Sequence, residues 1–374
     1  MARYKLSDVV MRIKDKVDKD NTDLEFYIGG EHFDNGEICI TKRGVIKEST
    51  IGPAFHMRFK PGDVLLMSRN PHLRKAGVVD FEGICSDVSY VCRTKDENVL
   101  MQRFLPFIFQ TDDFWKFAEE NKGGSTNFFL NWSDFERYEF ELPSIEKQRQ
   151  LTEILWAAQN AKLAYLELLR QTDELVKSQF IELFGDPVTN SKKLPTMKLS
   201  KLGELNRGVS KSRPRNKPEL MGGPYPLVQT GEVTAAELYI TNYENTYSEA
   251  GLAQSKMWPK GTLCITIAAN IAQTGILGFD ACFPDSVVGF LANDKVKQIY
   301  VHYWFGFFQK ILEEQAPQVA QKNINLKTLS DLDVMVPPIE QQNEFVLFVQ
   351  QTDKSKYCKQ NHVFSMTRGG ELCA

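Results

Sequence analysis

The sequence has no apolar stretch of roughly 18 residues, the length that a membrane-spanning helix needs, so no transmembrane segment is expected. Its first residues, MARYKLSDVVMRIKDK, are charged and amphipathic and lack the apolar segment of a signal peptide. The seven cysteines are dispersed without a CxxC pair, which indicates free thiols rather than a disulfide framework. The five histidines show no metal-ligand spacing. We therefore expect a cytoplasmic protein without a metal site.

Motifs of the common enzyme classes are missing as well. The sequence contains no GxxxxGKS/T phosphate loop, no GxGxxG fingerprint, no GxSxG elbow, no HExxH and no set of kinase motifs. Asn70-Pro71-His72 shares two residues with the Asn-Pro-Pro-aromatic motif of adenine methyltransferases, but the second proline and the aromatic residue are absent. The sequence therefore favours binding over catalysis.

A strong excess of positive charge is also missing. The net charge is -3 and the isoelectric point is about 6.1, whereas a nucleic-acid-binding protein that works alone is usually basic. This balance leaves room for local basic segments, or for a complex in which other subunits supply positive charge. With 374 residues, 42% hydrophobic and 25% charged, the chain is expected to form two or three globular domains of roughly 150 residues each.

The sequence does contain one distinctive segment twice. LPSIEKQRQLTEIL occupies residues 142–155 and VPPIEQQNEFVLFV occupies residues 336–349. Both read proline, a small or rigid residue, Ile-Glu, a polar residue and glutamine. The similarity continues upstream at the same offset, where Asn131 matches Asn325. A repeat at a constant offset indicates an internal duplication.

Further matches follow in the same order in both halves. They pair YKLSDVV (4–10) with MKLSKLG (197–203), ICIT (38–41) with LYIT (238–241), and FKPGDVLLMSRNPHLRKAGVVDF (59–81) with WPKGTLCITIAANIAQTGILGF (258–279). Each member of the last pair contains a Pro-Gly turn or its equivalent, an apolar strand, a polar loop and a second short strand. The shared order argues against chance similarity. We therefore predict two copies of one framework whose loops differ.

A long helix is predicted between the two copies. Residues 145–184 contain neither proline nor glycine, Pro143 and Ser144 precede them, and Gly185-Asp186-Pro187 follows. A helix of this length spans about 60 Å, too long for one small domain, so we interpret it as a rod between domains rather than a surface helix. Steps of three and four residues indicate a coiled-coil seam. Its members are Leu151, Ile154, Ala158, Ala161, Tyr165, Leu168 and Leu175, with Thr172 completing the series.

The second copy of the repeat begins a second helix. Ile339, Phe345 and Phe348 occupy the equivalent seam positions. From Tyr357 the heptad pattern fades, and the tail contains Gly369-Gly370. We predict a second helix about half as long as the first, or one whose end has been replaced, with an unrelated tail.

The duplication predicts an α+β protein, with two tandem α/β domains separated by long coiled-coil helices with pseudo-two-fold symmetry. Two similar helices of a duplicated chain can pack antiparallel, so that the globular domains face inversely. Duplex DNA also has local two-fold axes, and such a protein could place two reading domains on two separated DNA segments. The predicted parts are residues 1–142 (first domain), 143–186 (spacer helix), 187–336 (second domain) and 337–374 (shortened helix and divergent tail).

Several loops combine cations, amides and small residues, as expected of a DNA-binding surface. In the first domain the candidates are Lys42, Arg43, Arg69, Asn70, His72, Arg74, Lys75, Lys122, Thr126 and Asn127. In the second domain they are Arg207, Lys211, Arg213, Arg215, Lys217, Asn270, Gln273, Gln321, Lys322 and Asn323. Arginine can pair bidentately with guanine, and asparagine or glutamine with adenine, whereas lysine and Gly-rich backbone suit phosphates. For any single residue, a solvated loop is a better interpretation than a DNA contact. Taken together, the loops occupy matching places in the two repeats and differ in chemistry, which favours recognition of two different sequences.

The order of these parts resembles the specificity (S) subunit of type I restriction-modification systems. That order is a variable domain, a long helix opening with LPSIEKQRQ and closing with KSQFIELFGDP, a second variable domain, and VPPIEQQNEF. The resemblance extends over nearly the whole chain, to about Lys356. Its most specific parts are the two Pro-(Ser/Pro)-Ile-Glu-x-Gln segments and SQFIELFGDP at 178–187. The variable domains match only in framework.

That resemblance implies two target recognition domains, each reading one half of a bipartite, asymmetric site in double-stranded DNA, and helices that fix the unread gap. The subunit would have no catalytic activity and no cofactor of its own. It would recruit adenine methyltransferase subunits, which use S-adenosylmethionine. Motor and nuclease subunits, which use ATP and magnesium, would complete a complex for phage defence. The helix surfaces are the expected docking faces.

Two alternatives stay open on the sequence alone. One is a duplicated coiled-coil scaffold that does not bind DNA. The other is a silent or truncated specificity cassette, because members of the family usually carry a second helix about as long as the first. A fused single-chain restriction-methylation enzyme is not supported, because the chain lacks methyltransferase and nuclease motifs. The sequence leaves open which bases are read and how long the gap is.

Overall fold

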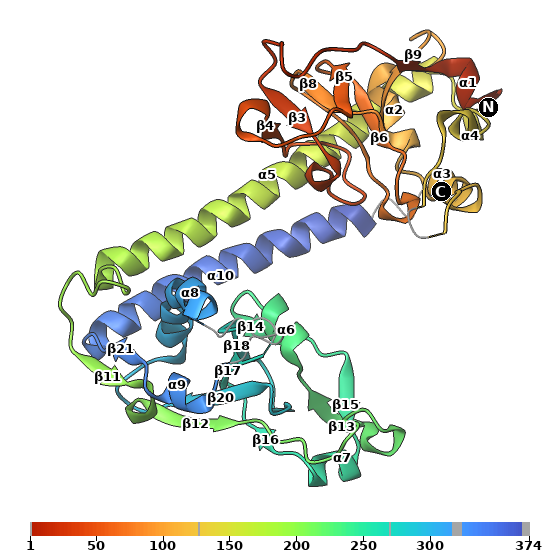
Figure 1. Ribbon diagram of the computed structural model, residues 1–374. Helices are drawn as coiled ribbons and strands as arrows, with labels where there is room; N and C mark the ends of the chain where they lie inside the picture. The colour runs from red at the N-terminus through yellow and green to blue at the C-terminus, as the bar shows by residue number, and fades with distance from the viewer. Residues whose placement is uncertain (1, 126–127, 269–270, 316–323, 369–374) are drawn as a thin grey trace. The chain divides into compact units, whose positions relative to one another are not determined.

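The computed structural model describes residues 2–125, 128–268, 271–315 and 324–368. The chain forms two compact units, Met1–Ala164 (unit 1) and Tyr165–Ala374 (unit 2). Helix α5 (Ile145–Phe184) contributes its first half to unit 1 and its second half to unit 2 (Figure 1). Its 40 residues confirm the predicted long helix between two sheet-containing parts, and the α+β class is confirmed with it.

Unit 1 contains three sheets. The first consists, in this order, of β2 (Val10–Ile13), β9 (Ser89–Thr94), β6 (Val64–Met67) and β7 (Ala76–Val78), all antiparallel. The second consists of β4 (Gly44–Val45), β3 (Phe26–Ile28), β8 (Gly83–Ser86) and β5 (Phe55–Phe59), in which β3 and β8 run parallel. The third pairs β1 (Ala2–Lys5) with β10 (Glu139–Leu142), just before α5.

The other helices of unit 1 are short. They are α1 (Leu6–Val9), α2 (Leu105–Ile108), α3 (Asp112–Glu120) and α4 (Trp132–Phe135), with 3-10 turns η1 (Gly30–His32), η2 (Ile46–Glu48), η3 (Pro71–Leu73) and η4 (Gln102–Phe104). Helices α2, α3 and α4 and the turn η4 pack with the antiparallel sheet in one buried cluster.

Unit 2 contains a matching set of sheets. The first consists of β12 (Gly203–Arg207), β20 (Val287–Ala292), β17 (Leu263–Thr266), β18 (Thr274–Leu277) and β14 (Tyr239–Ile240). The second consists of β15 (Asn245–Tyr247), β13 (Met221–Leu227), β19 (Ala281–Cys282) and β16 (Met257–Trp258). The third pairs β11 (Thr196–Lys198) with β21 (Asp333–Met335).

The helices of unit 2 complete the element list. They are α6 (Thr230–Ala235), α7 (Glu249–Ala253), α8 (Gln298–Gln315), α9 (Leu326–Ser330) and α10 (Ile339–Arg368), with 3-10 turns η5 (Leu199–Lys201) and η6 (Pro218–Leu220). No helix in the described ranges is both long enough and apolar enough to cross a membrane.

The two units repeat one architecture. β20 lies between β12 and β17 as β9 lies between β2 and β6, and each second sheet has a parallel pair at its centre. In unit 2, β14 pairs parallel with β18. In unit 1 the matching residues 38–40 pair parallel with β7 through a Cys39–Val78 bridge. The predicted duplication is therefore present, and the match of ICIT with LYIT marks equivalent backbone.

Each unit has its own aromatic core. In unit 1, Phe114 and Trp115 of α3 are buried among the helices that cover the antiparallel sheet. In unit 2, Phe180 of α5 stacks on Tyr300 of α8 with 5.4 Å between ring centroids, and contacts Phe345 of α10 edge-on, also at 5.4 Å. Burial of one such ring stabilises the fold by about 2 kcal/mol relative to an exposed position. The abundant phenylalanine thus attaches both long helices to the sheet of unit 2.

The repeated Pro-(Ser/Pro)-Ile-Glu-x-Gln segment has a structural explanation in its glutamine. Gln148, one turn inside α5, is fully buried. Its Nε2 donates to Val99 O at 2.8 Å and to Pro143 O at 3.0 Å, and its Oε1 accepts from Met101 N at 3.1 Å. The amide therefore connects the start of the helix to a loop of the same unit.

Gln342 makes the equivalent contacts at the start of α10. Its Nε2 donates to Lys295 O at 3.0 Å and to Pro337 O at 2.9 Å, and its Oε1 accepts from Lys297 N at 2.9 Å. It too is fully buried. Only a glutamine side chain both donates and accepts at this reach, so the segment occurs twice because each unit attaches a long helix in the same way.

Helix α10 is longer than predicted. Its 30 residues continue to Arg368, compared with 40 residues in α5. A shorter second helix is confirmed, but the predicted half-length was wrong. From Tyr357 to Arg368 the chain has no proline or glycine, so the helix continues without a heptad pattern and ends beside Gly369-Gly370. Within unit 2, α10 lies alongside the second half of α5 (Figure 1).

The predicted seam and the observed buried face of α5 coincide only in part. Leu151 packs against the unit 1 core, and Tyr165 is half-buried. Ile154, Leu168 and Leu175 are 65%, 38% and 54% exposed. Ala158 and Ala161 are also exposed. The heptad pattern did not identify the face of α5 that each unit covers. Successive residues of a helix point about 100° apart, so an error of one position selects a different face.

Other positions of the long helices carry the packing. The buried residues of α5 are Gln148, Thr152, Gln159, Val176, Phe180 and Phe184. In α10 the predicted positions agree better: Phe345 is buried, Phe348 packs against the core, and Ile339 is half-buried.

Replacing Gln148 by alanine should destabilise unit 1. The change leaves a buried N–H and two buried carbonyls without their partner, and we expect the free energy of unfolding to fall by about 2–4 kcal/mol. Urea unfolding of the full chain would measure it. The control is Gln150→Ala, on an exposed position of the same helix, which should change stability by less than about 0.5 kcal/mol. Equal stability of the two variants would contradict the structural role of the repeated glutamine.

Candidate nucleic-acid interface

One edge of the antiparallel sheet in unit 1 gathers several candidate loops. β2 and β6 both pair antiparallel with β9, so they run in the same direction and end at the same edge. Ile13 and Leu65 lie opposite the same residue, Val91. The segment 14–25, which follows β2, and the segment 68–75, which follows β6, therefore emerge side by side.

Backbone contacts fix the segment 68–75. Asn70 N donates to Phe128 O at 2.9 Å, and Leu130 N donates to Ser68 O at 2.9 Å. Asn70 and Arg74 adopt left-handed backbone angles, with φ of 52° and 50°. These bends expose Arg69, His72 and Arg74 around the buried Pro71. The structure therefore brings the cationic loop together with the segment that follows Lys122.

The cations on this edge differ in how they are held. Arg74 Nη1 contacts Asp112 Oδ1 at 2.5 Å, and Lys75 Nζ donates to Gly30 O at 2.7 Å. Lys122 Nζ lies 4.2 Å from the ring centroid of Phe128 and 3.5 Å from Glu119. Arg69 is exposed and forms no ion pair among the described residues. Arg69 is thus available to an external anion.

Two other candidates of unit 1 are held by neighbouring side chains. Arg43 stacks on Phe26, 3.9 Å from the ring centroid, and also faces Phe81, beyond the end of β7 that is remote from the loop. Lys42 pairs with Asp34 at 2.5 Å. The structure does not bring Arg43 to the edge that carries Arg69.

A cavity of about 470 Å³ opens beside the loop of unit 1. Its lining combines apolar and polar side chains: Phe55, Met67, Val88, Arg69, Asn70, Lys75 and Asp87. An apolar floor with cationic and amide groups around it has the chemistry to accommodate the edge of a base.

The equivalent edge of unit 2 is built in the same way. β12 and β17 both pair antiparallel with β20, and Arg207 and Ile265 both lie opposite Val288. Ile267 N donates to Ser286 O at 3.1 Å, and Ile324 N donates to Ile267 O at 3.0 Å. In unit 1 the same places are taken by Ser68 N to Val88 O, at 2.8 Å, and by Leu130 N to Ser68 O. The backbones of the two candidate surfaces are therefore equivalent.

The side chains on the two edges are not equivalent. In unit 2 the loop after β17 is largely apolar, and Gln273 is its polar candidate, half-buried beside Thr266. The positive charge lies instead on residues 207–217, after β12. Arg213 Nη2 contacts Asp285 Oδ2 at 3.1 Å, and Arg215 pairs with the other oxygen of the same carboxylate. Within the described ranges, the remaining cations there, Arg207, Lys211 and Lys217, form no ion pair.

Six predicted contact residues lie outside the described residues: Thr126, Asn127, Asn270, Gln321, Lys322 and Asn323. The carboxylates Asp112 and Asp285 were not among the candidates. Asp285 could have been found from the repeat, because it aligns with Asp87 in the turn before β9.

The titratable groups of the interior do not supply an activated nucleophile in the described part of the chain. Burial raises the pKa of the Cys85 thiol to about 12 and also raises those of Cys92 and Cys264, so these thiols stay protonated at neutral pH. Burial lowers the pKa of His302 to about 4, and its Nδ1 lies 2.9 Å from Thr274 Oγ1. No cluster of three metal-ligating side chains occurs in the ranges that the structure describes.

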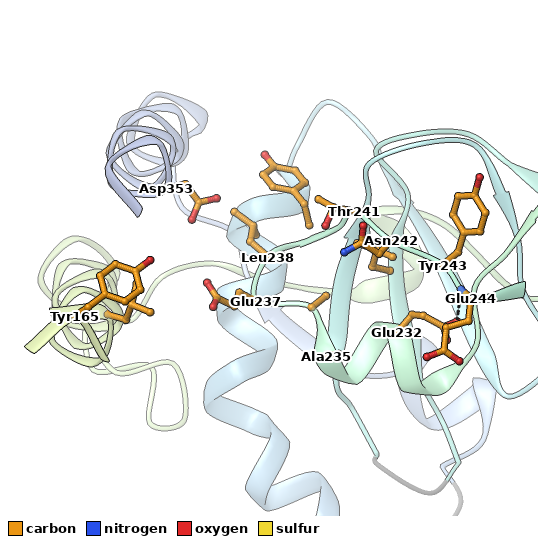
Figure 2. Close-up of a pocket in the computed structure, with 14 residues that line it drawn as sticks. Tyr165, Glu232, Ala235, Glu237, Leu238, Thr241, Asn242, Tyr243, Glu244 and Asp353 are labelled. Carbon is orange, nitrogen blue, oxygen red and sulfur yellow. Dashed lines mark hydrogen bonds between the residues drawn. The ribbon is translucent and has the colours of Figure 1, made fainter. Parts of the chain in front are cut away.

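A second cavity, of about 510 Å³, lies within unit 2 away from the cationic loop (Figure 2). Tyr165 and Leu169 of α5 and Asp353 of α10 line one side, and residues 235–244 line the other. Glu232, Glu237 and Glu244 make the lining acidic. Such a lining repels phosphate, so this cavity is not the candidate DNA surface.

Comparison with known proteins identifies a family domain in the second part of the chain. The family model described as "Type I restriction modification DNA specificity domain" matches residues 194–361. A specificity subunit assigned to the MjaX type I restriction enzyme of Methanocaldococcus jannaschii is 19% identical over 335 residues, covering 83% of this chain and 76% of that protein.

One solved structure supports the fold, and a second is reported with it. The S subunit of a type I restriction-modification system from M. genitalium is 11% identical, with a TM-score of 0.61, covering 99% of this chain and 94% of that chain. The HsdS subunit of Thermoanaerobacter tengcongensis is 16% identical, with a TM-score of 0.41, covering 96% and 91%. Residues 194–361 thus match the family's DNA specificity domain, and the whole chain shares the fold of an S subunit, so the chain is similar to the specificity subunits of type I restriction-modification systems.

Proposed function

We propose that this subunit reads a bipartite, asymmetric site in double-stranded DNA, with one half-site bound by each unit. The observation that supports this most is that two equivalent sheet edges carry different side chains. Equivalent frameworks bind the same kind of ligand, whereas different side chains select different sequences. Each edge also carries an exposed cation without an ion pair among the described residues, Arg69 in unit 1 and Lys211 in unit 2, which suits a polyanion.

The rest of the proposal concerns the complex. The subunit is non-catalytic and cytoplasmic, and it needs no cofactor of its own. The long helices α5 and α10 set the spacing of the two half-sites and dock adenine methyltransferase subunits. Those subunits bring S-adenosylmethionine, and motor and nuclease subunits bring ATP and magnesium. The exposed apolar residues Ile154, Leu168 and Leu175 of α5 support docking on the helix, because apolar side chains at regular spacing are costly to leave in water.

Methylation mapping would test the site. The chain would be expressed with the methyltransferase encoded beside its gene in a host that lacks adenine methylation, and methylated adenines would be mapped across the DNA. We expect one split, asymmetric motif with a fixed gap. No methylation by an intact methyltransferase would contradict the proposal and favour a silent cassette or a scaffold without DNA binding.

Substitutions on the two edges should weaken different halves of the motif. Arg69→Ala should lower methylation at sites that depend on the unit 1 half, and Lys211→Ala should weaken binding roughly three- to tenfold with little change of sequence preference, as loss of one phosphate contact does. Methylation mapping with Arg69→Ala would measure the first effect, and the affinity of Lys211→Ala for the mapped and an unrelated duplex at several salt concentrations would measure the second.

Matched controls lie at the opposite ends of the same strands. Lys60 and Lys260 are exposed and precede β6 and β17, whereas the candidate loops follow these strands. Lys60→Ala and Lys260→Ala should leave affinity and salt dependence unchanged. If they reduced affinity as much as Arg69→Ala and Lys211→Ala do, binding would not be located at the proposed edges.

A further inference from the structure

The cationic loop of unit 2 is held in place at several points. Ser255 Oγ donates to Val209 O at 2.8 Å, and Ser212 N donates to Gln254 Oε1 at 3.0 Å. Lys211 N contacts Gln254 O at 3.3 Å. These bonds attach the loop to the segment after α7, so its exposed side chains start from a fixed backbone.

A single carboxylate then orders the two arginines of this loop. Asp285 lies in the turn before β20, on the edge where β12 and β17 end. One of its oxygens accepts from Arg213 and the other from Arg215. Two guanidinium groups two residues apart repel each other, and a shared carboxylate offsets that repulsion while fixing both planes. The pair keeps one net positive charge.

The two arginines differ in the donors that they have left. Arg213 Nη1 also donates to Ser210 O at 2.6 Å and to Ser212 O at 2.9 Å, so its guanidinium is occupied by its own unit. Arg215 contacts Asp285 through Nη2, and in the described part of the chain its Nε and Nη1 make no hydrogen bond. The Arg215 side chain is 41% exposed. It therefore presents an oriented, partly unused donor fork to solvent.

We propose that Arg215, oriented by Asp285, reads a guanine in the half-site bound by unit 2, and that Arg213 is the positioning residue that holds the loop. A guanine offers two acceptors, O6 and N7, at the separation that an arginine fork matches. The inference rests on the proposed function. It adds to that function the identity of one base, and it assigns base recognition to Arg215 and a structural role to Arg213.

The described residues of unit 1 do not contain an equivalent pairing of this carboxylate with two arginines. Asp87 occupies the place of Asp285, since Ser68 N bonds Val88 O as Ile267 N bonds Ser286 O. The segment after β2, KDKVDKDNTDLE, contains no arginine, and Asp87 accepts instead from Arg12 through its backbone carbonyl, at 3.2 Å. The proposed guanine contact therefore belongs to one half-site only.

The test uses the full chain in complex with its methyltransferase and a library of randomised duplex DNA from which bound duplexes are selected and sequenced. Wild type should select a split motif with a guanine in one half. Arg215→Lys keeps the charge but loses the fork, and should reduce the preference for that guanine roughly tenfold or more. Asp285→Asn should reduce the same preference, because Arg215 loses its orientation, while affinity for unrelated duplex stays equal or rises with the removal of a negative charge.

The possible results separate misfolding, loss of the guanine contact and failure of the proposed function. Retention of the other half-site shows that a variant is folded, and Lys260→Ala should leave the whole motif unchanged. An unaltered guanine preference in Arg215→Lys overturns the inference alone. A wild-type complex that selects no motif overturns the proposed function, and this inference with it.

Discussion

Both candidate surfaces depend on one constraint, the antiparallel pairing of two strands with a common central strand. β9 in unit 1 and β20 in unit 2 are almost wholly buried and each pair with a neighbour on either side. Because both neighbours run the same way, the loops that follow them must meet at one edge. The hydrophobic core therefore determines where the variable loops lie, without limiting which side chains they carry.

Much of this framework could be predicted from the sequence because it is written twice. Asn131 and Asn325 match in sequence and are the N-cap residues of α4 and α9. Gln148 and Gln342 match and make the same three hydrogen bonds. These side chains bond backbone groups that lie at a similar distance along the chain in both units. A repeat of the sequence therefore preserves their partners as well as their identity.

The parts that could not be predicted depend on contacts between distant residues. Arg74 and Asp112, or Arg215 and Asp285, are brought together only by the fold, and no local pattern marks them. The prediction of the buried face of α5 was wrong for the same reason. Leu168 and Leu175 fit a heptad, yet the core of unit 2 covers Val176 and Phe180 instead. Periodicity finds a helix and its apolar positions, whereas the partner decides which of them are covered.

The ion pairs also bear on the proposal that a slightly acidic chain carries two DNA-binding edges. A surface arginine that is paired with a carboxylate contributes little to long-range attraction of phosphate, because the two charges cancel beyond about a Debye length of roughly 8 Å. Pairing does not cancel its donors at contact distance. Each edge thus combines free cations, such as Arg69 and Lys211, with paired arginines that are oriented for particular acceptors. Because the whole chain has a net charge of -3, the subunits proposed to dock on its long helices would add to its attraction to DNA.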